Sequence, residues 1–361
     1  MRKGNFLSTI DWFQVVIILA LLSFGSMALF GFSGTEKIHL GWLQIFYSAI
    51  GLVLMTICSF VDYRWLKGVG WWLFSLGLVI LVLVMFFGQT NFGAKRWIDF
   101  KILQFQPSEI VKIIFIIMLA KFLSERDNFR FKHLIYLLAI LILPVMLIIS
   151  QPDFGTSTVY FAIFLGLMFI SKIPQYYWLI LLVFIAIATP LIWFNLYDYQ
   201  KQRIVSFVDP QSNAAASYNV EQSKIAIGSG GLFGRGIGQG TQSQLKFLPV
   251  AYSDFIFAAI AEGTGFFGAI ILILAEFLLV WRLVVCAKVA QDGFGWYFCA
   301  GLAILILYQT FINIGGNLGF VPVTGVPLPL VSYGGTGLIS YLAGLGVAQS
   351  IYLRHKKLSF E

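Results

Sequence analysis

Long apolar runs follow one another along almost the whole chain, and polar residues gather between them. The runs lie at Trp12–Gly31, Gly41–Phe60, Trp71–Gly88, Ser108–Phe122, Leu134–Ser150, Phe154–Ser171, Pro174–Phe194, Asp254–Val280, Trp296–Gly315 and Val331–Leu353. A helix needs about 20 apolar residues to cross the hydrocarbon core of a bilayer. The pattern therefore predicts an all-α integral membrane protein with about ten transmembrane helices. The fourth run is the shortest, and it carries Glu109 and Lys112.

The positions of Lys and Arg predict which side of the membrane each segment faces. An even number of helices places both chain ends on the same side. With both ends inside, fourteen Lys and Arg lie in cytoplasmic segments and nine in external ones, five of these in one long loop. Because basic residues are enriched in cytoplasmic loops, we expect both termini to be cytoplasmic. Residues 1–361 then form a single polytopic membrane domain.

Three polar or irregular segments fall on the external side in this topology. Residues 91–109 are polar and then amphipathic, and residues 315–337 are rich in Gly and Pro at membrane depth. Such backbone is tolerated where protein buries it or where it lines a wet cavity. The third segment is a large external loop, residues 195–253, between the seventh and eighth helices. Loops of this length are uncommon unless they are functional, and this one contains the helix-like stretch NVEQSKIAI.

Composition agrees with a membrane protein. The chain is 59% hydrophobic and only 11% charged, whereas soluble domains carry about 25% charged residues. Basic cytoplasmic loops explain the net charge of +8, so we expect no nucleic acid partner. The three cysteines, Cys58, Cys286 and Cys299, lie in or beside apolar runs without the spacing of a metal site. We interpret them as small buried hydrophobic residues.

Ionisable residues in or beside the apolar runs are the main functional candidates, because charges are costly in a membrane. Glu109 and Lys112 are three residues apart on one predicted helix, so they share a face and can pair. Asp153, in QPDFGTS, stands where a helix begins and can cap it. Glu262 lies about 12 Å below the outer end of the eighth run, and Glu276 lies near its inner end.

Asp254 has the strongest case for chemistry. It opens the eighth run, in YSDFIF, directly after the large loop, where water and a lipid head group can both reach it. Partial desolvation there would raise its pKa and make it a better general base. Several cationic residues that suit a diphosphate lie in the predicted external segments or just inside the membrane border. They are Lys95, Arg96, Arg203, Lys246 and Lys112.

The large loop also carries GSGGLFGRGIGQG, with seven glycines between Gly228 and Gly240. No G-K-[ST] ends this stretch and no strand precedes it, so it matches neither a Walker A loop nor a dinucleotide fingerprint. Two interpretations are open. One is a tightly folded loop that uses positive φ angles, and the other is a loop whose N–H groups approach a phosphate.

Several motifs occur in order along the chain and together resemble one family. They are GAKRWIDF, QFQPSEIVK, QPDFGTS, QRIVSFVDP, the loop from QSKIAIGSGG to YSDFIFAAIAE, and GVPLPLVSYGGTG. These segments closely resemble the SEDS family (shape, elongation, division and sporulation), which consists of ten-span bacterial peptidoglycan glycosyltransferases. The resemblance covers nearly the whole length. The stretch GTQSQLKFLP is similar to the rod-shape branch rather than to the division branch.

The resemblance implies a reaction. The family polymerises lipid II into glycan strands on the outer face of the bacterial cytoplasmic membrane, and the rod-shape branch does so during cell elongation and shape maintenance. A GlcNAc 4-hydroxyl attacks, a β-1,4 bond forms with inversion, and lipid diphosphate leaves. The family's essential aspartate corresponds to Asp254, which would act as the general base. The other family positions correspond to Glu109 and Lys112, to Asp153 and to Arg203.

The chain departs from the family pattern just before Asp254. The family reads FLP-E-x-H-T-D, and this chain reads FLPVAYSD, with Val250 and Tyr252 in place of the acid and the His. Neither residue can therefore replace the acid or the His of the family pattern as an acid, a base or a metal ligand. The departure leaves Asp254 itself in place.

Other functions are also compatible with the sequence. The irregular Gly- and Pro-rich segments and the intramembrane Glu109, Lys112 and Glu262 would suit a flippase or transporter of lipid-linked precursors. A scaffold that only binds a partner is a second alternative, and it is compatible with an enzyme. A polymerase of the division or sporulation branch is a third.

The expected ligands and partners follow from the resemblance. They are lipid II, lipid-linked glycan, membrane lipid and a class B penicillin-binding protein, the transpeptidase that crosslinks the strands. No cofactor is required by the motifs, and the external segments contain no dense acid cluster for a protein metal site. A divalent cation, Mg²⁺ or Mn²⁺, held partly by the lipid diphosphate stays open.

Overall fold

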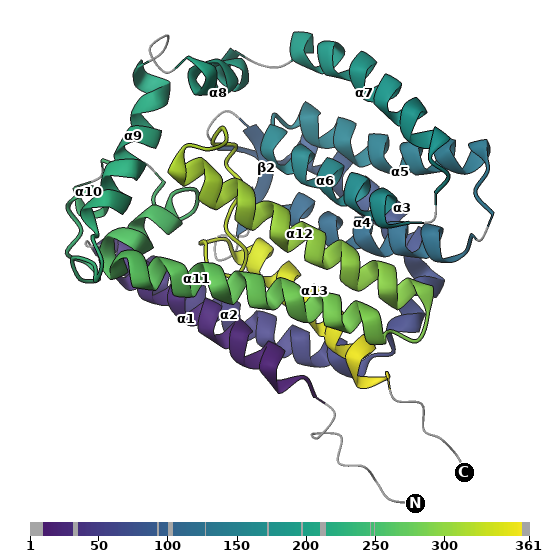
Figure 1. Cartoon of the computed structure of the whole chain (residues 1–361), viewed down its shortest axis with the longest axis horizontal. Helices are drawn as coiled ribbons and strands as arrows, with labels where there is room; N and C mark the ends of the chain where they lie inside the picture. The colour runs from purple at the N-terminus through teal and green to yellow at the C-terminus, as the bar shows by residue number, and fades with distance from the viewer. Residues whose placement is uncertain are drawn as a thin grey trace, which may run out of the picture.

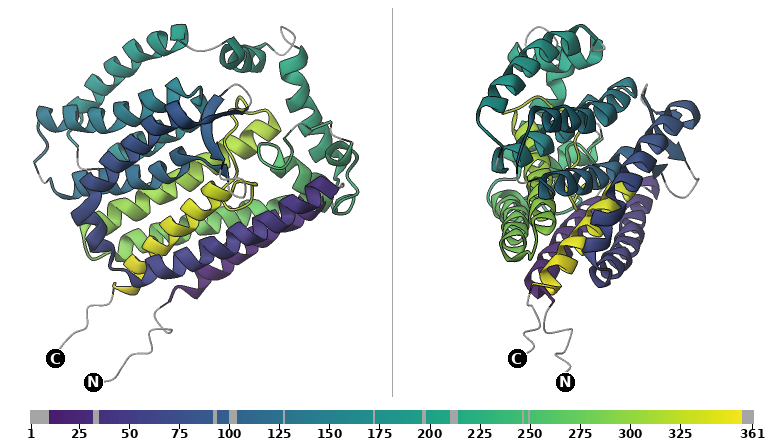
Figure 2. Two further views of the ribbon diagram at one scale, coloured as in Figure 1. Left: turned by 180° about the vertical axis from the view of Figure 1, so that it is seen from behind. Right: turned by 90° about the vertical axis from the view of Figure 1, so that its right-hand side faces the viewer.

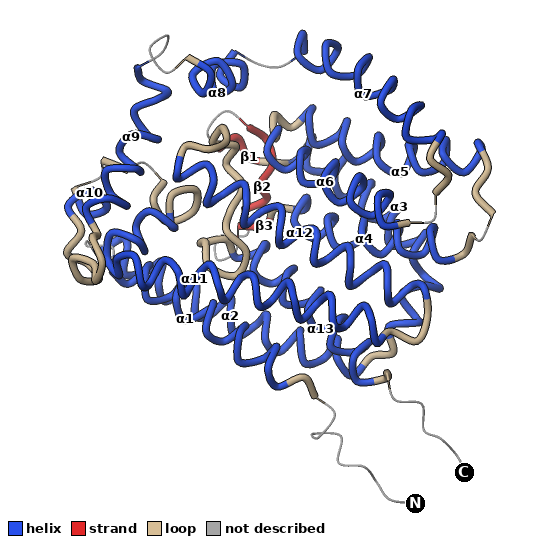
Figure 3. Tube along the Cα trace, viewed as in Figure 1, coloured by secondary structure: helices blue, strands red, loops and turns tan. Residues whose placement is uncertain are grey.

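The computed structural model describes residues 10–31, 35–91, 94–99, 104–126, 128–171, 173–195, 198–209, 214–245, 247–248 and 250–355. These residues form a bundle of long helices, with short helices, strands and loops gathered toward one end (Figure 1 and Figure 3). The bundle places the polar segments that the sequence singled out at that same end.

Ten long helices coincide with the ten apolar runs. They are α1 (Trp12–Gly31), α2 (Thr35–Phe60), α3 (Tyr63–Phe87), α4 (Pro107–Ser124), α5 (Phe131–Ser150), α6 (Phe154–Ile170), α7 (Tyr176–Asn195), α11 (Ile256–Val289), α12 (Gly293–Leu318) and α13 (Gly335–Leu353). The larger differences from the predicted bounds are that α3 begins at Tyr63 rather than Trp71, and that α11 continues to Val289 rather than Val280.

The described residues form an all-α, multi-pass membrane protein, as the sequence predicts. Seven of the described helices are long and apolar enough to cross a membrane, and two shorter ones, Phe154–Ile170 and Tyr176–Ile187, are also apolar. Large apolar side chains such as Phe86 and Leu179 are more than half exposed on the bundle surface. Such a surface suits hydrocarbon as the surrounding solvent.

Helix ends follow local sequence signals. The Asp62 carboxylate accepts from the N–H of Arg64 at 3.0 Å and so caps α3. The Asp292 carboxylate caps α12 through the N–H of Gly295, also at 3.0 Å. At the other end of α12, Gly319 adopts the left-handed conformation with φ +77°, which glycine reaches at little cost.

Helix α4 lies inside the bundle and carries charges into it. Nearly all of its side chains are buried, including those of Glu109 and Lys112. It packs against α3, α12 and α13. By contrast, α7, drawn in teal, lies at the periphery in both views of Figure 2, and its Leu179 and Phe194 are largely exposed.

The start of α1 and the end of α13 meet at one end of the bundle. The Arg282 guanidinium on α11 lies 2.6 Å from the Asp11 carboxylate, just before α1. It also lies 5.6 Å from the ring centre of Tyr352 in the last turn of α13. The two ends of the described chain are therefore on the same side, as an even number of spans requires.

Two segments contain elements that hydropathy did not predict. Between α3 and α4 the described residues form a small antiparallel sheet of β1 (Gln89–Asn91), β2 (Ala94–Asp99) and β3 (Gln104–Phe105), in the order β1-β2-β3. The large loop holds three helices: α8 (Asp198–Val208), α9 (Ala214–Ser229) and α10 (Thr241–Gln244). The helix-like stretch NVEQSKIAI falls within α9, so that prediction is confirmed.

Helix α11 is interrupted, and the Gly-rich loop fills the interruption. Gly265 has φ +69° and ψ −165°, which no helix adopts. Four backbone hydrogen bonds join the loop to the break: the N–H groups of residues 235 and 236 donate to the carbonyls of residues 262 and 263, and those of residues 266 and 267 donate to the carbonyls of residues 231 and 232. The loop thus satisfies backbone groups that the broken helix leaves unpaired.

This close contact explains the glycines. A Cβ atom at Gly234 would lie 2.2 Å from the Gly263 carbonyl oxygen, and one at Gly230 would lie 2.1 Å from that of Ala261. Gly234 and three other loop glycines also have positive φ. The interpretation as a tightly folded loop is confirmed, and the N–H groups of residues 235 and 236 are already engaged by helix carbonyls rather than free for a phosphate.

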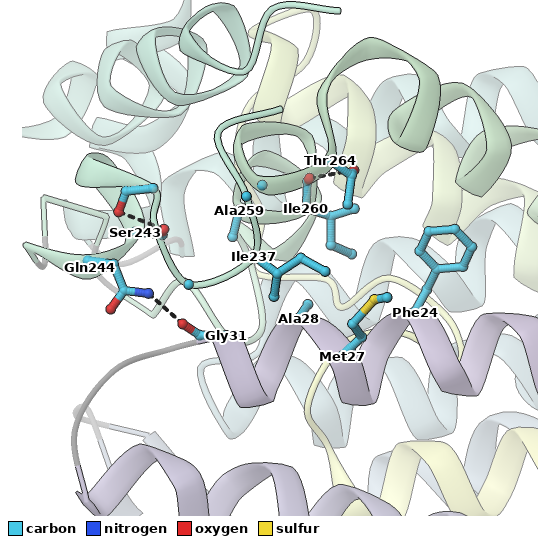
Figure 4. A pocket seen from close by; sticks show the side chains of 14 residues that line it. Phe24, Met27, Ala28, Gly31, Ile237, Ser243, Gln244, Ala259, Ile260 and Thr264 are labelled. Carbon is cyan, nitrogen blue, oxygen red and sulfur yellow. Dashed lines mark hydrogen bonds between the residues drawn. The ribbon is translucent and has the colours of Figure 1, made fainter. Parts of the chain in front are cut away.

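The same loop also contacts α1. The Gln244 side chain donates to the carbonyl of Gly31, the last residue of α1, and Ile237 lies over Ala28 and Met27 (Figure 4). A small cavity of about 30 Å³ remains between the loop, α1 and α11. The loop therefore bridges two helices, and it leads along the chain toward Asp254.

Candidate active site

A large cavity opens among the irregular segments at the loop end of the bundle. Its volume is about 1010 Å³, the upper end of the range for small-molecule sites. Its walls come from β2, from the starts of α4, α6 and α13, from α8, from the turn 250–254 and from the loop 322–334. Among its lining side chains are Arg96, Glu109, Asp153, Arg203 and Asp254.

The backbone at Asp254 is fixed by two amides one turn apart on α12. The Asn313 and Asn317 side chains donate to the Asp254 carbonyl at 3.2 and 2.9 Å. The preceding turn closes through the Asp254 N–H and the Val250 carbonyl, at 3.3 Å. Val250 has φ +51°, a costly conformation for a β-branched residue. Such strain persists where the surroundings determine the backbone, as they do here.

The Asp254 carboxylate faces the cavity. One oxygen accepts from the Ser253 hydroxyl at 2.6 Å, and the side chain is partly exposed. Burial raises the pKa of Asp254 above its usual range, and the Ser253 hydrogen bond and the Arg203 and Arg96 guanidiniums oppose that rise. A carboxylate with a raised pKa is a stronger base than an ordinary aspartate.

The Gly325 backbone lies beside both Asp254 and Arg203. It has φ +75°, and a Cβ atom there would lie 3.5 Å from an Asp254 carboxylate oxygen and 3.6 Å from Nη1 of Arg203. Arg203 itself donates to the Val323 carbonyl at 3.4 Å. The exposed guanidinium of Arg203 is thereby held beside the loop that carries Gly325.

A second guanidinium that lines the cavity, that of Arg96, forms an ion pair with Asp153. Nη1 of Arg96 lies 3.2 Å from an Asp153 carboxylate oxygen, and the Gln106 amide donates to the same oxygen at 3.1 Å. The other Asp153 oxygen caps α6 by accepting from the Thr156 N–H at 3.1 Å. Asp153 therefore caps its helix, as the sequence predicts, and also orients Arg96.

The predicted pair of Glu109 and Lys112 is confirmed. Nζ of Lys112 lies 2.8 Å from each Glu109 carboxylate oxygen. Glu109 lines the cavity, whereas Lys112 is only 1% exposed and lies beneath it. The same ammonium approaches the Tyr341 hydroxyl at 3.4 Å, and that hydroxyl donates to Gln309. Three helices thus meet at one buried polar group of side chains.

The other predicted site residues have different outcomes. Lys95 belongs to β2, but its side chain is not among those the structure describes. Lys246 lies outside the described residues. Glu262 was expected to be an intramembrane candidate, but its carboxylate accepts from the N–H groups of Gln242 and Ser243 at 2.8 and 3.0 Å. It anchors the Gly-rich loop and does not line the cavity.

Glu276 is buried on α11, where the Thr310 hydroxyl donates to it at 3.4 Å. It too lies away from the cavity lining. Among the residues that the structure describes, no group of three or more His, Cys, Asp or Glu side chains is placed to hold a metal ion. The cavity offers carboxylates and guanidiniums instead.

Aromatic residues of the cavity were missed by sequence reasoning. Trp97 on β2 lines it, together with Tyr47, Tyr252 and Tyr333. The motifs GAKRWIDF and GVPLPLVSYGGTG contain Trp97 and Tyr333, so those motifs held the signal. Tyr47 lies in an unremarkable apolar run, and nothing in its sequence context indicates the site.

Comparison with known proteins agrees with the motif pattern. A family model described as the FtsW, RodA and SpoVE cell cycle protein family matches residues 6–357. The peptidoglycan glycosyltransferase MrdB of Escherichia coli strain K12 is 40% identical over 354 residues, which is 97% of this chain and 95% of that protein.

Solved structures of similar chains share the fold. The rod shape determining protein RodA of Thermus thermophilus superposes with a TM-score of 0.72 at 28% identity, covering 95% of this chain and 96% of that one. A chain from a structure described as the coordination of polymerization and crosslinking by a peptidoglycan synthase complex gives a TM-score of 0.80 at 29% identity, covering 95% and 97%. The chain therefore belongs to the FtsW, RodA and SpoVE family, which is the SEDS family that its motifs resemble.

Proposed function

We propose that this chain is a peptidoglycan glycosyltransferase of the rod-shape branch, which polymerises lipid II into glycan strands for cell elongation. The observation that carries the proposal is a partly buried carboxylate, Asp254, with two guanidiniums close enough to lower its pKa, inside a cavity of about 1010 Å³. The similarity to MrdB over 97% of the chain supports the same reaction class.

In the proposed step, Asp254 accepts the proton of the GlcNAc 4-hydroxyl on the acceptor. The hydroxyl oxygen attacks the anomeric carbon of the donor and forms the new C–O bond. The bond from that carbon to the lipid diphosphate breaks, and its electron pair leaves on the diphosphate oxygen. The proton on Asp254 then passes to water. Because the donor linkage is α and the product linkage is β, a single displacement with inversion is expected.

The cations of the cavity suit the leaving diphosphate. Arg203 and Arg96 are fixed donors on the same cavity as Asp254, and guanidiniums bind phosphate oxygens in bidentate fashion. Lys112 lies below the floor and balances the charge of Glu109 rather than reaching the cavity. A divalent cation held partly by the diphosphate would add to this charge balance.

The partner and the orientation belong to the same proposal. A similar chain is part of a peptidoglycan synthase complex that joins polymerization to crosslinking, so we propose a class B penicillin-binding protein as the partner of this chain. Both termini would be cytoplasmic by the distribution of basic residues. The cavity would then open on the outer face of the cytoplasmic membrane, where lipid II is consumed.

Translocation of lipid-linked precursors is the competing function. That interpretation used Glu109, Lys112 and Glu262 as intramembrane groups, but Glu109 and Lys112 pair with each other and Glu262 is engaged by the Gly-rich loop. A polymerase forms glycan polymer in detergent micelles, because its reaction needs only one compartment. A flippase forms no new product there, because it moves lipid between two compartments. The test is to incubate purified protein with lipid II in detergent micelles and to separate the products by length. Glycan polymer is expected, and unchanged lipid II with active lipid transfer in vesicles would overturn the proposal.

A scaffold without activity is tested in cells. If the Asp254→Asn protein supports growth while deletion of the gene does not, the chain acts by binding its partner. We expect the Asp254→Asn protein to fail to support growth at a normal expression level.

A further inference from the structure

The segments that line the cavity contribute different chemistry. Arg96, Asp153 and Arg203 contribute charged groups, whereas three tyrosines line the cavity from α2, from the turn before Asp254 and from the loop before α13. Tyr252 and Tyr333 are 5.9 Å apart between ring centres at an interplanar angle of 83°, and Tyr333 and Tyr47 are 6.4 Å apart at 53°. All three line the cavity. We call Tyr47, Tyr252 and Tyr333 the tyrosine wall.

Hydrogen bonds and close packing fix the tyrosine wall. The Tyr333 N–H donates to the Tyr252 carbonyl at 2.9 Å, so the turn before Asp254 and the loop before α13 are joined at this point. Tyr47 is only 2% exposed, and its ring lies against Gly335, where a Cβ atom would be 2.8 Å away. A wall held in this way offers ring surface at little entropic cost on binding.

The tyrosine wall lies beside the reacting group. Tyr252 precedes Asp254 by two residues in the same turn, and the Asp254 charge contributes to the raised pKa of Tyr252, after the larger effect of burial. The Ser332 hydroxyl, next to Tyr333, donates to the Ser253 carbonyl at 2.7 Å. Tyr252 and Tyr333 therefore lie on two segments that meet beside Asp254.

The chemistry of a pyranose ring matches such a wall. In a GlcNAc ring with equatorial substituents, the axial C–H groups form apolar faces, while the hydroxyl groups lie around the rim. Aromatic rings bury such faces and tolerate polar groups at their edges. An ordinary tyrosine is already protonated at neutral pH, and burial raises the pKa of Tyr252 further, so it does not compete with Asp254 as a base.

We propose that Tyr252 and Tyr333 form the subsite that stacks the acceptor GlcNAc ring and aims its 4-hydroxyl at Asp254. The proposal rests on the proposed function and assigns one half of the substrate to one part of the cavity. Tyr252 occupies the position at which the family pattern has His, so this subsite belongs to this chain rather than to the pattern. The guanidiniums of Arg96 and Arg203 then serve the donor diphosphate.

Two lipid II analogues allow the KM of the acceptor and the KM of the donor to be measured separately. One carries a carbon linkage in place of the scissile diphosphate bond and can only accept, and the other lacks the GlcNAc 4-hydroxyl and can only donate. With Tyr252→Leu, the KM for the acceptor-only analogue is expected to rise about fivefold, the size of an aromatic contact. The KM for the donor-only analogue is expected to stay within twofold of wild type.

Two variants control this measurement. Tyr252→Phe keeps the ring and is expected to recover most of the lost acceptor affinity, because the ring face rather than the hydroxyl makes the contact. Tyr218→Leu removes an exposed tyrosine on α9 that does not line the cavity, and it is expected to change neither KM. Equal damage by Tyr252→Phe and Tyr252→Leu, or a change confined to the donor KM, would overturn the subsite.

A binding measurement makes the test independent of turnover. In saturation-transfer NMR with the acceptor-only analogue and wild-type protein in nanodiscs, the ring protons of GlcNAc are expected to receive more saturation than those of the lipid. Strong transfer to the GlcNAc ring, together with no polymer from lipid II in a separate assay, would keep the subsite and overturn the polymerase function. Normal polymerisation with no transfer to the GlcNAc ring would keep the function and overturn the subsite.

Discussion

Breaking the Glu109–Lys112 pair is expected to destabilise the protein strongly. Both partners are buried, at 5% and 1% exposure, and Nζ of Lys112 lies 2.8 Å from both carboxylate oxygens. At an effective dielectric constant of 20, two charges at this distance attract by about 6 kcal/mol. Removal of one partner leaves the other charge buried and uncompensated, which costs about 3–5 kcal/mol.

The assay is a double-mutant cycle on the free energy of unfolding, measured by titration with SDS in mixed micelles. Lys112→Met and Glu109→Gln are each expected to lose about 3–5 kcal/mol, and the double variant is expected to recover most of that loss, because no uncompensated charge remains. Lys121→Met is the matched control. It removes a cation of the same helix whose ammonium donates only to a carbonyl in the described contacts, that of Gly68 at 3.3 Å, and about 1 kcal/mol is expected.

The reasoning fails if either single variant loses less than about 1 kcal/mol, or if the double variant is as unstable as the worse single one. The first result would mean that water or another group already compensates the charges. The second would mean that the two side chains act through packing rather than through their pairing.

Three further predictions concern the loop and the base. Glu262→Gln is expected to speed proteolysis within residues 230–245, because it replaces one of the two oxygens that accept from the Gln242 and Ser243 N–H groups with an NH₂ donor; unchanged cleavage would contradict the anchoring role. Gly234→Ala is expected to destabilise the protein by more than about 1 kcal/mol, since φ is +81° and the added Cβ would meet the Gly263 carbonyl, whereas Gly228→Ala, with open space on α9, is expected to be neutral or stabilising. The rate is expected to fall with decreasing pH as Asp254 becomes protonated, and because burial raises its pKa the fall begins at a higher pH than for an ordinary aspartate; a rate independent of pH between 4 and 8 would argue against this base.

The membrane helices could be predicted from the sequence because hydrocarbon demands a specific length of apolar residues. All ten predicted runs became helices; some ends were extended, as at the start of α3, and others were shortened, as at the start of α13. The strands β1–β3 were not predicted, because each is short and hydropathy does not distinguish such strands from polar loop. The break at Gly265 could not be predicted either, since it depends on backbone groups of a loop about thirty residues earlier.

The candidate site was predicted in part. Asp254, Asp153 and Arg203 stood out because charges at a membrane border are costly and because motifs mark them. The sequence did not predict that these three side chains line one cavity. It did not predict the tyrosine wall either, because Tyr47, Tyr252 and Tyr333 lie far apart along the chain. Glu262 was misassigned because a carboxylate that holds a loop and one that lines a cavity have the same signature in a hydropathy pattern.

The central claim is that Asp254 is the base of the transfer step, and its most direct test is the rate of lipid II polymerisation by the purified Asp254→Asn protein. Loss of a general base predicts a rate about 10²–10⁴-fold below wild type, with unfolding unchanged because the amide has the same size. Asp209→Asn, an exposed aspartate of the large loop outside the cavity, serves as the control and is expected to polymerise normally. A folded Asp254→Asn protein that polymerises within about threefold of wild type would contradict the account, since a base is worth at least about 10²-fold.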